Sequence, residues 1–351
     1  MEPPDAGDRP VGWAWKMIKR EFWKAKPVFV TGGTGFLGGW VIRRLLENGA
    51  EVVGLVRDGA PRCMFVSEGD ESRVTTVHGS VENYDLLKRA LSEYSIDTVL
   101  HLAAQPLVGV AKLDPVGTFE ANIKGTWNVL EAARQAKVKQ VIIASSDKAY
   151  GESTNLPYTE DHPLQGRYPY DCSKSCADLI AQMYHATYGN AVSVVRCANL
   201  FGGGDLNFSR TIPGCIQSTL QGERFTIRSD GLFVRDFLYI KDAADAYLYL
   251  AQSLGAGAPQ GAYNFSLEVK LTVLDCVDQV LTHMHRKDLE PIILNQASSE
   301  IREQYMVCEK ARRVLGWKPN YDMNKALKET IDWYTSFLTK ASERTSISVR
   351  M

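Results

Sequence analysis

Hydrophobic positions follow two periods along this chain. Short runs dominated by apolar and β-branched residues occur at 27–31, 51–56, 74–77, 97–104, 140–146 and 192–196. Such runs are typical of strands that are buried on both faces, as in a parallel sheet. Between them, apolar residues recur every three or four positions, which is the spacing of one face of a helix.

The segment 36–48 shows this helical spacing most clearly. Its apolar residues fall on one face: Phe36, Leu37, Trp40, Val41 and Leu45. Gly49 follows as a residue suited to the left-handed position after a helix. Further helices are expected near 84–94, 115–136 and 173–188. The alternation predicts an α/β fold with a Rossmann-like, doubly wound parallel sheet covered by helices on both faces.

The loop after the first strand reads TGGTGFLGG and places Gly32, Gly35 and Gly38 three apart. Between a strand and a helix, such glycines allow a tight turn, close approach of the backbone to a pyrophosphate, and tight packing of helix on strand. Because a second strand follows about 20 residues later, the loop predicts a dinucleotide-binding site.

The end of the second strand leaves the choice of dinucleotide open. Arg57 could meet the 2′-phosphate of NADP, whereas Asp58 could hold the free ribose hydroxyls of NAD. Either residue could also be solvated. NAD and NADP are therefore both expected candidates.

The sequence pattern changes after Leu200, where glycine-rich loops replace the regular alternation of strand-like and helix-like segments. A smaller C-terminal, substrate-binding lobe is expected there. Residues 13–26 mix aromatic and basic side chains and predict a short amphipathic helix that covers its own domain, is partly disordered, or meets a membrane surface or partner. The predicted organisation is an extension (1–26), a dinucleotide-binding domain (27–202, with returns near 235–265), a lobe (203–234 and 266–338) and a flexible tail (339–351).

Charge, cysteine spacing and hydrophobic content argue against several classes of binding partner. Lys and Arg number 40 against 41 Asp and Glu, so a formal charge of −1 gives no bulk attraction to nucleic acid or an anionic membrane. The seven cysteines form no CxxC pair, which argues against a disulfide framework or a zinc site, and no metal is expected. No apolar stretch approaches the roughly 20 residues that span a bilayer. A cytoplasmic protein is expected.

The motif YPYDCSK places Tyr170 and Lys174 four residues apart, on one face of a helix. A tyrosine has a pKa of about 10 and is a poor base at neutral pH. Lowering that pKa to about 7 requires roughly 4 kcal/mol, at ~1.36 kcal/mol per unit, which a nearby ammonium and a positive nicotinamide could provide. Tyr170 is then a plausible base for an alcohol that loses hydride.

The stretch IIASSDKAYG ends an apolar run with two ionisable residues, Asp147 and Lys148. Charged groups beside a buried strand are costly unless they are paired or used. They could form a salt bridge at the end of the strand or lie in solvent. Together with Tyr170 and Lys174, they indicate a catalytic use.

The glycine pattern TGxxGFxG, the LAA after the fourth strand and YxxxK resemble the extended short-chain dehydrogenase/reductase superfamily. Within it, several stretches are most similar to the nucleotide-sugar dehydratase branch, CDP-glucose 4,6-dehydratases above all: LAAQPLV, DPxxTFxxNxxGT at 114–126, SSDKAYG, PYDCSK, GGGD and LGWKP. The resemblance runs from about residue 22 to residue 334.

This resemblance implies oxidation at C4 of a hexose, loss of water across C5 and C6, and return of the hydride to C6. Besides Tyr170 and Lys174, it implies that Ser146 hydrogen-bonds the C4 oxygen and that Asp147 acts as the acid at C6. Lys148 stands where many dehydratases carry a glutamate base. As a base, it needs a lowered pKa, which desolvation and a positive nicotinamide favour.

The resemblance also implies the binding residues. Cofactor contacts are expected from Gly32, Thr34, Gly35, Phe36, Leu37, Gly38, Arg57, Asp58, Ser80, Val81, Leu102, Ala103, Ala104, Tyr170 and Lys174. Substrate contacts are expected from Gln105, Asn199, Arg210, Arg235 and Arg302. For Arg235, a surface ion pair with Asp236 is the alternative.

Two positions depart from the pattern. Ser80 stands where the superfamily often has an aspartate that holds the adenine, and Gly109-Val110-Ala111 replace an arginine and a small hydroxyl residue. Substrate contacts near 109–111 are expected to differ.

Rival functions are a C4 epimerase or decarboxylase of the same superfamily, or a non-catalytic dinucleotide-binding protein. A homodimer formed through the helix before the SSDK strand and the YxxxK helix is implied.

Overall fold

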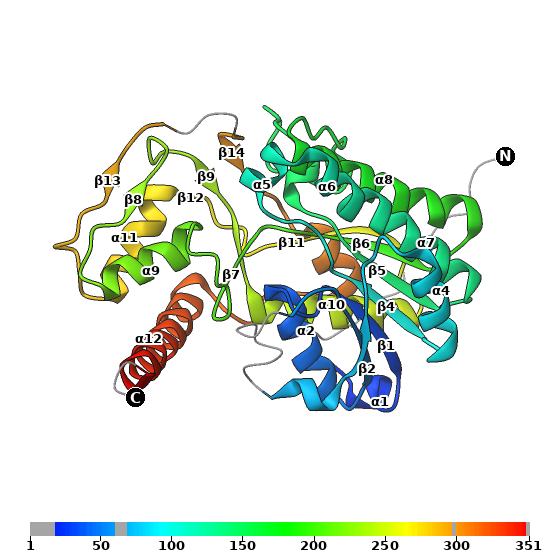
Figure 1. The fold of residues 1–351 in the computed structure, drawn as a ribbon. Coiled ribbons are helices and arrows are strands. Elements are labelled where there is room, and N and C mark those ends of the chain that lie inside the picture. The colour runs from blue at the N-terminus through cyan, green and yellow to red at the C-terminus, as the bar shows by residue number, and fades with distance from the viewer. Residues whose placement is uncertain (1–17, 60–68, 297–299, 349–351) are drawn as a thin grey trace.

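The computed structural model describes residues 18–59, 69–296 and 300–348. In that part of the chain, the larger lobe is a seven-stranded sheet in which all neighbouring strands are parallel (Figure 1). The strand order is β11-β6-β5-β4-β1-β2-β3. The predicted Rossmann-like sheet is confirmed. Its strands are β1 (Pro27–Thr31), β2 (Glu51–Val56), β3 (Thr75–His78), β4 (Thr98–His101), β5 (Gln140–Ala144), β6 (Val192–Cys197) and β11 (Gly261–Phe265).

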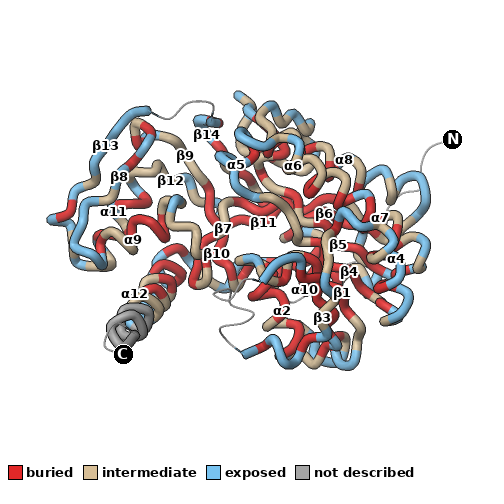
Figure 2. Tube along the Cα trace, in the orientation of Figure 1, coloured by how far each residue is buried: buried red, intermediate tan, exposed pale blue. Residues whose placement is uncertain are grey.

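Helices cover both faces of this sheet, as predicted. One face carries α2 (Phe36–Glu47) and α10 (Ile240–Gly255), and the other carries α4 (Tyr84–Glu93), α7 (Gly125–Gln135) and α8 (Pro169–Tyr188). Strand residues alternate between the two cores: Val28 and Val30 pack on the first face and Phe29 on the second. The central strands are accordingly buried throughout (Figure 2), which explains their apolar sequences.

The smaller lobe consists of short strands and helices that follow residue 200. It contains one sheet of order β12-β9-β14 and the pair β13-β8, while the pair β10-β7 lies between the two lobes (Figure 1). The elements are β7 (Asn199–Phe201), α9 (Thr211–Leu220), β8 (Thr226–Ile227), β9 (Val234–Arg235), β10 (Phe237–Tyr239), β12 (Leu271–Thr272), α11 (Val273–His283), β13 (Ile292–Ile293), β14 (Glu303–Gln304) and α12 (Met323–Ser348). The short η4 (Ala311–Leu315) packs against β11 of the main sheet.

Some segments differ from the sequence-based expectation. The predicted tail 339–351 is helical as far as Ser348, because α12 continues through residues that include the good helix formers Ala341 and Arg344. The predicted helix 13–26 is a single turn in the described residues, and 13–17 lie outside them. Trp23 in that turn is buried, so it covers its own domain. The remaining short elements are α1 (Arg20–Trp23), η1 (Asp70–Arg73), α5 (Val108–Leu113), α6 (Pro115–Phe119), η2 (Glu120–Lys124) and η3 (Asp147–Tyr150).

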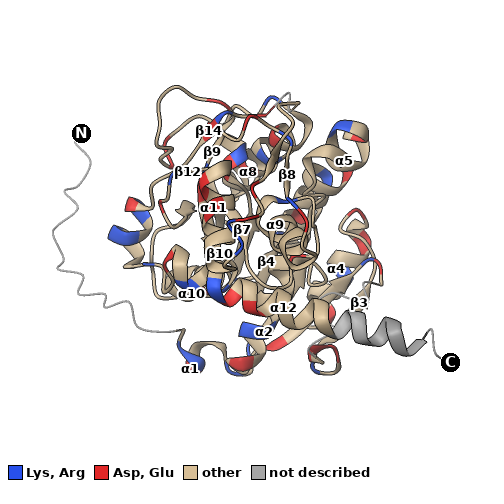
Figure 3. Cartoon of the chain, turned by 90° about the vertical axis from the view of Figure 1, so that its left-hand side faces the viewer, with Lys and Arg blue, Asp and Glu red and all other residues tan. Residues whose placement is uncertain are grey.

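Charged side chains of both signs are interspersed over the view in Figure 3, in keeping with a formal charge of −1. Among the described residues, no helix is both long and apolar enough to cross a bilayer.

A buried carboxylate at Asp236 joins the two lobes. Its Oδ1 accepts hydrogen bonds from the backbone N–H groups of Phe237 and Val269, at 2.8 and 3.1 Å. Its Oδ2 accepts from Ser266 Oγ at 2.5 Å and from the backbone N–H of Met306 at 3.2 Å. These partners follow β9, β11 and β14, so one side chain orders segments from both lobes.

We expect Asp236→Ala to lower the free energy of unfolding by about 3 to 5 kcal/mol, because it leaves several buried donors without an acceptor. Urea denaturation measures the change. Asp278→Ala on α11 is the control, since the Asp278 side chain is 64% exposed and its removal should change stability by less than about 0.5 kcal/mol. Equal losses in the two variants would contradict the junction role.

Candidate active site

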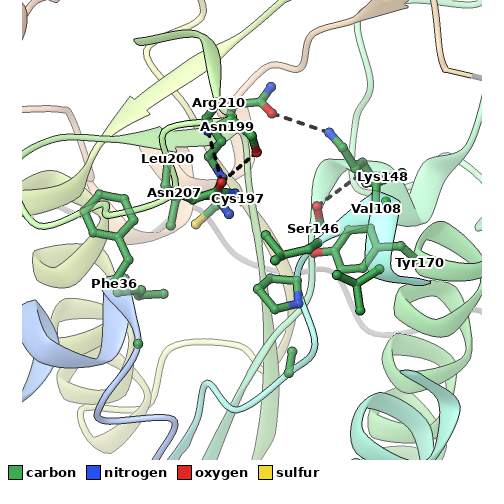
Figure 4. Close-up of a pocket in the computed structure, with 18 of the residues that line it drawn as sticks. Phe36, Val108, Ser146, Lys148, Tyr170, Cys197, Asn199, Leu200, Asn207 and Arg210 are labelled. Atoms are coloured by element: carbon green, nitrogen blue, oxygen red, sulfur yellow. Dashed lines mark hydrogen bonds between the residues drawn. The ribbon is translucent and has the colours of Figure 1, made fainter. Parts of the chain in front are cut away.

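A cleft of about 1570 Å³ lies between the carboxyl ends of the main strands and the smaller lobe, and residues of both line it. The strand order reverses between β1 and β4, and ligands of doubly wound sheets bind at this point. Figure 4 shows Ser146, Lys148 and Tyr170 near one another on one side of the cleft, with Phe36 of the glycine loop across from them.

The glycine loop fits a pyrophosphate. Gly32 has a φ of +75°, and a Cβ there would lie 2.7 Å from the backbone nitrogen of Ala103. A Cβ on Gly38 would lie 2.0 Å from the carbonyl oxygen of Gly32. Gly35, the N-cap of α2, provides no side chain to bond the first N–H groups of the helix. Those groups are therefore available to an anion, as dinucleotide binding requires.

His101 on β4 links this strand to β1, its neighbour at the point where the strand order reverses. Its Nδ1 lies 2.8 Å from Thr31 Oγ1 and its Nε2 lies 3.1 Å from Thr126 Oγ1. Thr31 Oγ1 also accepts hydrogen bonds from the backbone N–H groups of Leu102 and Ala103. Burial, together with the charge of Lys174, lowers the pKa of His101 to about 3, so the ring is neutral at pH 7. The network fixes the LAA segment beside the glycine loop.

The ribose end of the cleft carries an exposed ion pair. Arg57 Nε lies 2.6 Å from Asp58 Oδ2, and the two side chains are 66% and 69% exposed. Both residues line the cleft, as do Ser80 and Val81 after β3. The geometry at Arg57 and Asp58 is compatible with either a ribose diol or a 2′-phosphate.

Tyr170 and Lys174 lie on α8, which begins at Pro169, four residues earlier than predicted. Both are buried and line the cleft. Burial lowers the pKa of Lys174 to about 8, and its Nζ donates to the carbonyl oxygen of Ala144 at 2.9 Å. Burial, with the charge of Asp147, raises the pKa of Tyr170 above its ordinary value. The lowered pKa that the chemistry needs is therefore not produced by the protein side chains alone.

Ser146, Asp147 and Lys148 form the turn that follows β5. Ser146 is the N-cap of η3: its Oγ accepts from the backbone N–H of Lys148 at 3.2 Å and donates to Asp147 Oδ1 at 2.9 Å. Asp147 is only 2% exposed, and its Oδ2 has no hydrogen-bond partner among the described residues. That oxygen can carry a proton without losing a hydrogen bond.

Lys148 is held by amide oxygens from other elements. Its Nζ donates to Gln304 Oε1 at 3.0 Å and to Asn199 Oδ1 at 3.4 Å, and lies 3.8 Å from Asp147 Oδ1. The side chain is 21% exposed. Asp147 and Lys148 are thus near neighbours, but the closest partner of the amine is a neutral amide.

Three of the predicted substrate residues line the cleft: Asn199, Arg210 and Arg235. The Arg235 side chain is 16% exposed and its Nη2 lies 3.4 Å from Glu300 Oε2, so its ion pair is with Glu300 and not with Asp236. Burial lowers the pKa of Arg235 below its ordinary value. Its Nη1 also donates to the carbonyl oxygens of Val234 and Arg302, at 2.9 and 3.3 Å. A partly buried guanidinium held in this way suits an anionic ligand.

Gln105 and Arg302 are not brought to the wall of the cleft. The Gln105 amide bonds Thr118 Oγ1 and the backbone of Leu107, which orders the chain before α5. Arg302 is 61% exposed and lies 3.5 Å from Asp230 Oδ2. The sequence pattern around them did not show which way their side chains point.

Two residues of the site were missed by sequence reasoning. Asp171, inside the YPYDCSK motif, lines the cleft and is 4% exposed. Burial raises the pKa of Asp171 to about 6, while the charge of Lys148 acts in the opposite direction. Its place beside Tyr170 was the available signal. Gln304 had none, because it comes from a two-residue strand far along the chain.

Residues 107–110, which include part of the segment 109–111 that departs from the family pattern, form an apolar rim of the cleft. Leu107, Val108 and Val110 line the cleft at α5 and are 37%, 36% and 42% exposed. A ligand meets mainly hydrocarbon on this side.

The chain matches the NAD dependent epimerase/dehydratase family over residues 28–266. It is 30% identical to a CDP-glucose 4,6-dehydratase of Salmonella typhimurium over 342 residues, which cover 92% of this chain and 94% of that protein.

Two solved structures show the same fold. A dTDP-glucose 4,6-dehydratase from Streptomyces venezuelae with NAD bound has a TM-score of 0.81 at 27% identity, covering 88% of this chain and 97% of that chain. A UDP-glucose 4-epimerase from Thermotoga maritima has a TM-score of 0.81 at 26% identity, covering 89% and 99%. Similarity therefore extends to dehydratases and epimerases alike.

The buried neutral His101 predicts acid sensitivity. Its pKa is about 3 in the folded protein and about 6.5 when unfolded, so the unfolded state binds more protons between these values. Its contribution to stability is present above pH 6.5 and is lost as pH falls. Between pH 7 and pH 5, we expect wild type to lose about 2 kcal/mol more of its unfolding free energy than His101→Gln. Urea denaturation at the two pH values measures this difference, and parallel losses would contradict it.

Proposed function

Because the chain belongs to the NAD-dependent epimerase/dehydratase family, we propose that it is a nucleotide-sugar 4,6-dehydratase. It would convert an NDP-hexose, with CDP-glucose favoured, into the NDP-4-keto-6-deoxyhexose. The observation that carries this proposal is the placement of Asp147 and Lys148 in one cleft with Ser146 and Tyr170. An epimerase needs no such additional acid and base.

The first step is oxidation at C4. Tyr170 takes the proton of the C4 hydroxyl, Ser146 hydrogen-bonds that oxygen, and Lys174 provides positive charge from the same helix. Bound NAD, held by the glycine loop, would supply hydride acceptance at C4, hydride return at C6 and a positive ring that favours the Tyr170 phenolate. NAD is the cofactor of the family, which resolves the choice that Arg57 and Asp58 left open.

The second step is elimination of water. The C4 ketone acidifies the C5 proton, which Lys148 removes, and the electron pair forms the C5–C6 double bond as the C6–O bond breaks. Asp147 gives its proton to the departing hydroxyl, so water leaves. Lys148 then returns a proton to C5. The neighbouring positions of the two groups, with Nζ and Oδ1 3.8 Å apart, support action on adjacent carbons.

The diphosphate would be bound by Arg235 and Arg210, which line the cleft on the side of the smaller lobe. Arg210 Nη1 lies 2.9 Å from Asp205 Oδ2. A C4 epimerase remains the second candidate, because the UDP-glucose 4-epimerase structure is as similar in fold as the dehydratase structure.

We further propose a homodimer formed through α7 and α8. Trp127 on α7 is 43% exposed, and Leu179 and Met183 on α8 are 54% and 42% exposed. By contrast, Ala177 and Ala181 on α8 are buried within the chain. The six cysteines among the described residues are free thiols, and we expect the enzyme to work in the reducing cytoplasm.

Product masses test the proposed function. With CDP-, dTDP- and UDP-glucose, we expect one or more products lighter than the substrate by one water, CDP-glucose reacting fastest. Tyr170→Phe should reduce turnover at least about 100-fold, because it removes the proton acceptor, while CDP binding persists. Tyr188→Phe at the exposed end of α8 is the matched control. A product of unchanged mass would indicate the epimerase, and loss of carbon dioxide the decarboxylase.

The dimer proposal predicts that Leu179→Arg combined with Trp127→Glu yields a monomer, because charge would be buried at the interface. Sedimentation velocity measures the oligomeric state. Leu220→Arg, on the lobe helix α9 where Leu220 is 40% exposed, is the control and should leave the state unchanged. A wild-type monomer, or a double variant that stays dimeric, would contradict the proposal.

A further inference from the structure

Gln304 reaches the catalytic turn from the smaller lobe. It lies on β14, is 1% exposed and lines the cleft. Its Oε1 accepts a hydrogen bond from Lys148 Nζ at 3.0 Å, across 156 residues of sequence. Among the hydrogen bonds of Lys148 Nζ to described residues this is the shortest, since the bond to Asn199 Oδ1 is 3.4 Å.

The Gln304 amide is not explained by fold stability. Its Nε2 is buried without a hydrogen-bond partner among the described residues. Burying an amide N–H without an acceptor is destabilising, and an apolar side chain of similar size would avoid that loss. Of the two ends of the amide, only the oxygen is engaged, and it is engaged by the amine of Lys148.

The strand that carries Gln304 is fixed to the residue expected to bind the diphosphate. β14 pairs in parallel with β9, and Gln304 is the register partner of Arg235. The pairing is supported by the bond from the backbone N–H of Val234 to the carbonyl oxygen of Arg302, at 3.0 Å. One short ladder therefore sets both Gln304 and Arg235 relative to the cleft.

A neutral acceptor suits a lysine base. Lys148 has a long, flexible side chain, and Asp147 Oδ1 is only 3.8 Å from its Nζ. Closer pairing with Asp147 would draw the amine toward the acid and favour its charged form. The charge of Lys148 also acts on Asp171, against the effect of burial, and lowers the pKa of that carboxyl group. The amide oxygen of Gln304 fixes Nζ at 3.0 Å, nearer than Asp147 Oδ1, and adds no negative charge beside it.

We infer that Gln304 is a positioning residue for the elimination step: its amide oxygen places the Lys148 amine for removal of the C5 proton. Gln304 acts through Lys148 and takes no part in the oxidation at C4. This inference rests on the proposed dehydratase function and adds a residue from the lobe to the catalytic turn.

The test is Gln304→Leu, which keeps the approximate size and removes the acceptor. We expect kcat for CDP-glucose to fall at least tenfold, while the dissociation constant for CDP, measured by calorimetry, stays within twofold of wild type. The kinetic isotope effect with substrate deuterated at C5 should increase, and that with substrate deuterated at C4 should not. Gln304→Met is a second variant of the same design, in case Gln304→Leu does not fold.

A double-mutant cycle separates positioning from a general structural role. In a Lys148→Ala background, Gln304→Leu should change the residual rate by less than twofold, because the side chain that it positions is gone. Gln279→Leu is the matched control: Gln279 lies on α11 of the same lobe, also has a buried amide oxygen without a partner among the described residues, and should leave kcat unchanged.

The inference is overturned by a kcat within twofold of wild type in Gln304→Leu, by an unchanged isotope effect at C5 when kcat falls, or by an equal loss in the Lys148→Ala background. These outcomes differ from failure of the proposed function. If wild-type protein releases no water from CDP-, dTDP- or UDP-glucose, the dehydratase proposal itself is wrong. If wild type dehydrates the substrate and Gln304→Leu has an unchanged kcat, only the positioning role of Gln304 is refuted and the dehydratase proposal stands.

Discussion

The buried carboxylate of Asp236 is the interaction on which the cleft depends. It lies between β9, which carries Arg235 to the cleft, and β10, which lies between the two lobes. Its two oxygens accept hydrogen bonds from the neighbouring residue 237 and from residues 266, 269 and 306, which lie 30 to 70 positions away. Because the turn at 146–148 follows a strand of the sheet while Arg210 and Arg235 belong to the lobe, their separation is set by this junction.

The first turns of α8 combine groups whose pKa values burial shifts in opposite directions. Burial disfavours charge on Tyr170, Lys174 and Asp171 alike, which raises the pKa of the two acids and lowers that of the ammonium. Lys174 at about 8 and Asp171 at about 6 thereby approach neutrality from opposite sides. Near neutral pH, the two protonation states of each of these groups beside Tyr170 therefore differ little in free energy.

Sequence predicted those parts of the site that depend on local spacing. The glycine loop, the turn at 146–148 and the pair Tyr170 and Lys174 are each defined by residues within one strand-loop-helix unit, and all line one cleft. The parts that depend on long-range pairing were not predictable. Gln304 reaches Lys148 only because β14 pairs with β9, and Gln105 turns toward Thr118 and not toward the cleft. The helical extension to Ser348 was missed because its polar residues were interpreted as a tail.

The apolar rim at α5 affects how a sugar nucleotide can be recognised. Leu107, Val108 and Val110 present hydrocarbon to the cleft on this side. These three side chains provide no acceptor or donor to select a sugar hydroxyl, and Lys112 is the polar side chain of α5 that lines the cleft. On the proposed function, discrimination among nucleotide-sugars therefore rests on the catalytic groups and on the lobe residues, above all Arg235, whose partly buried guanidinium is paired with Glu300 at 3.4 Å.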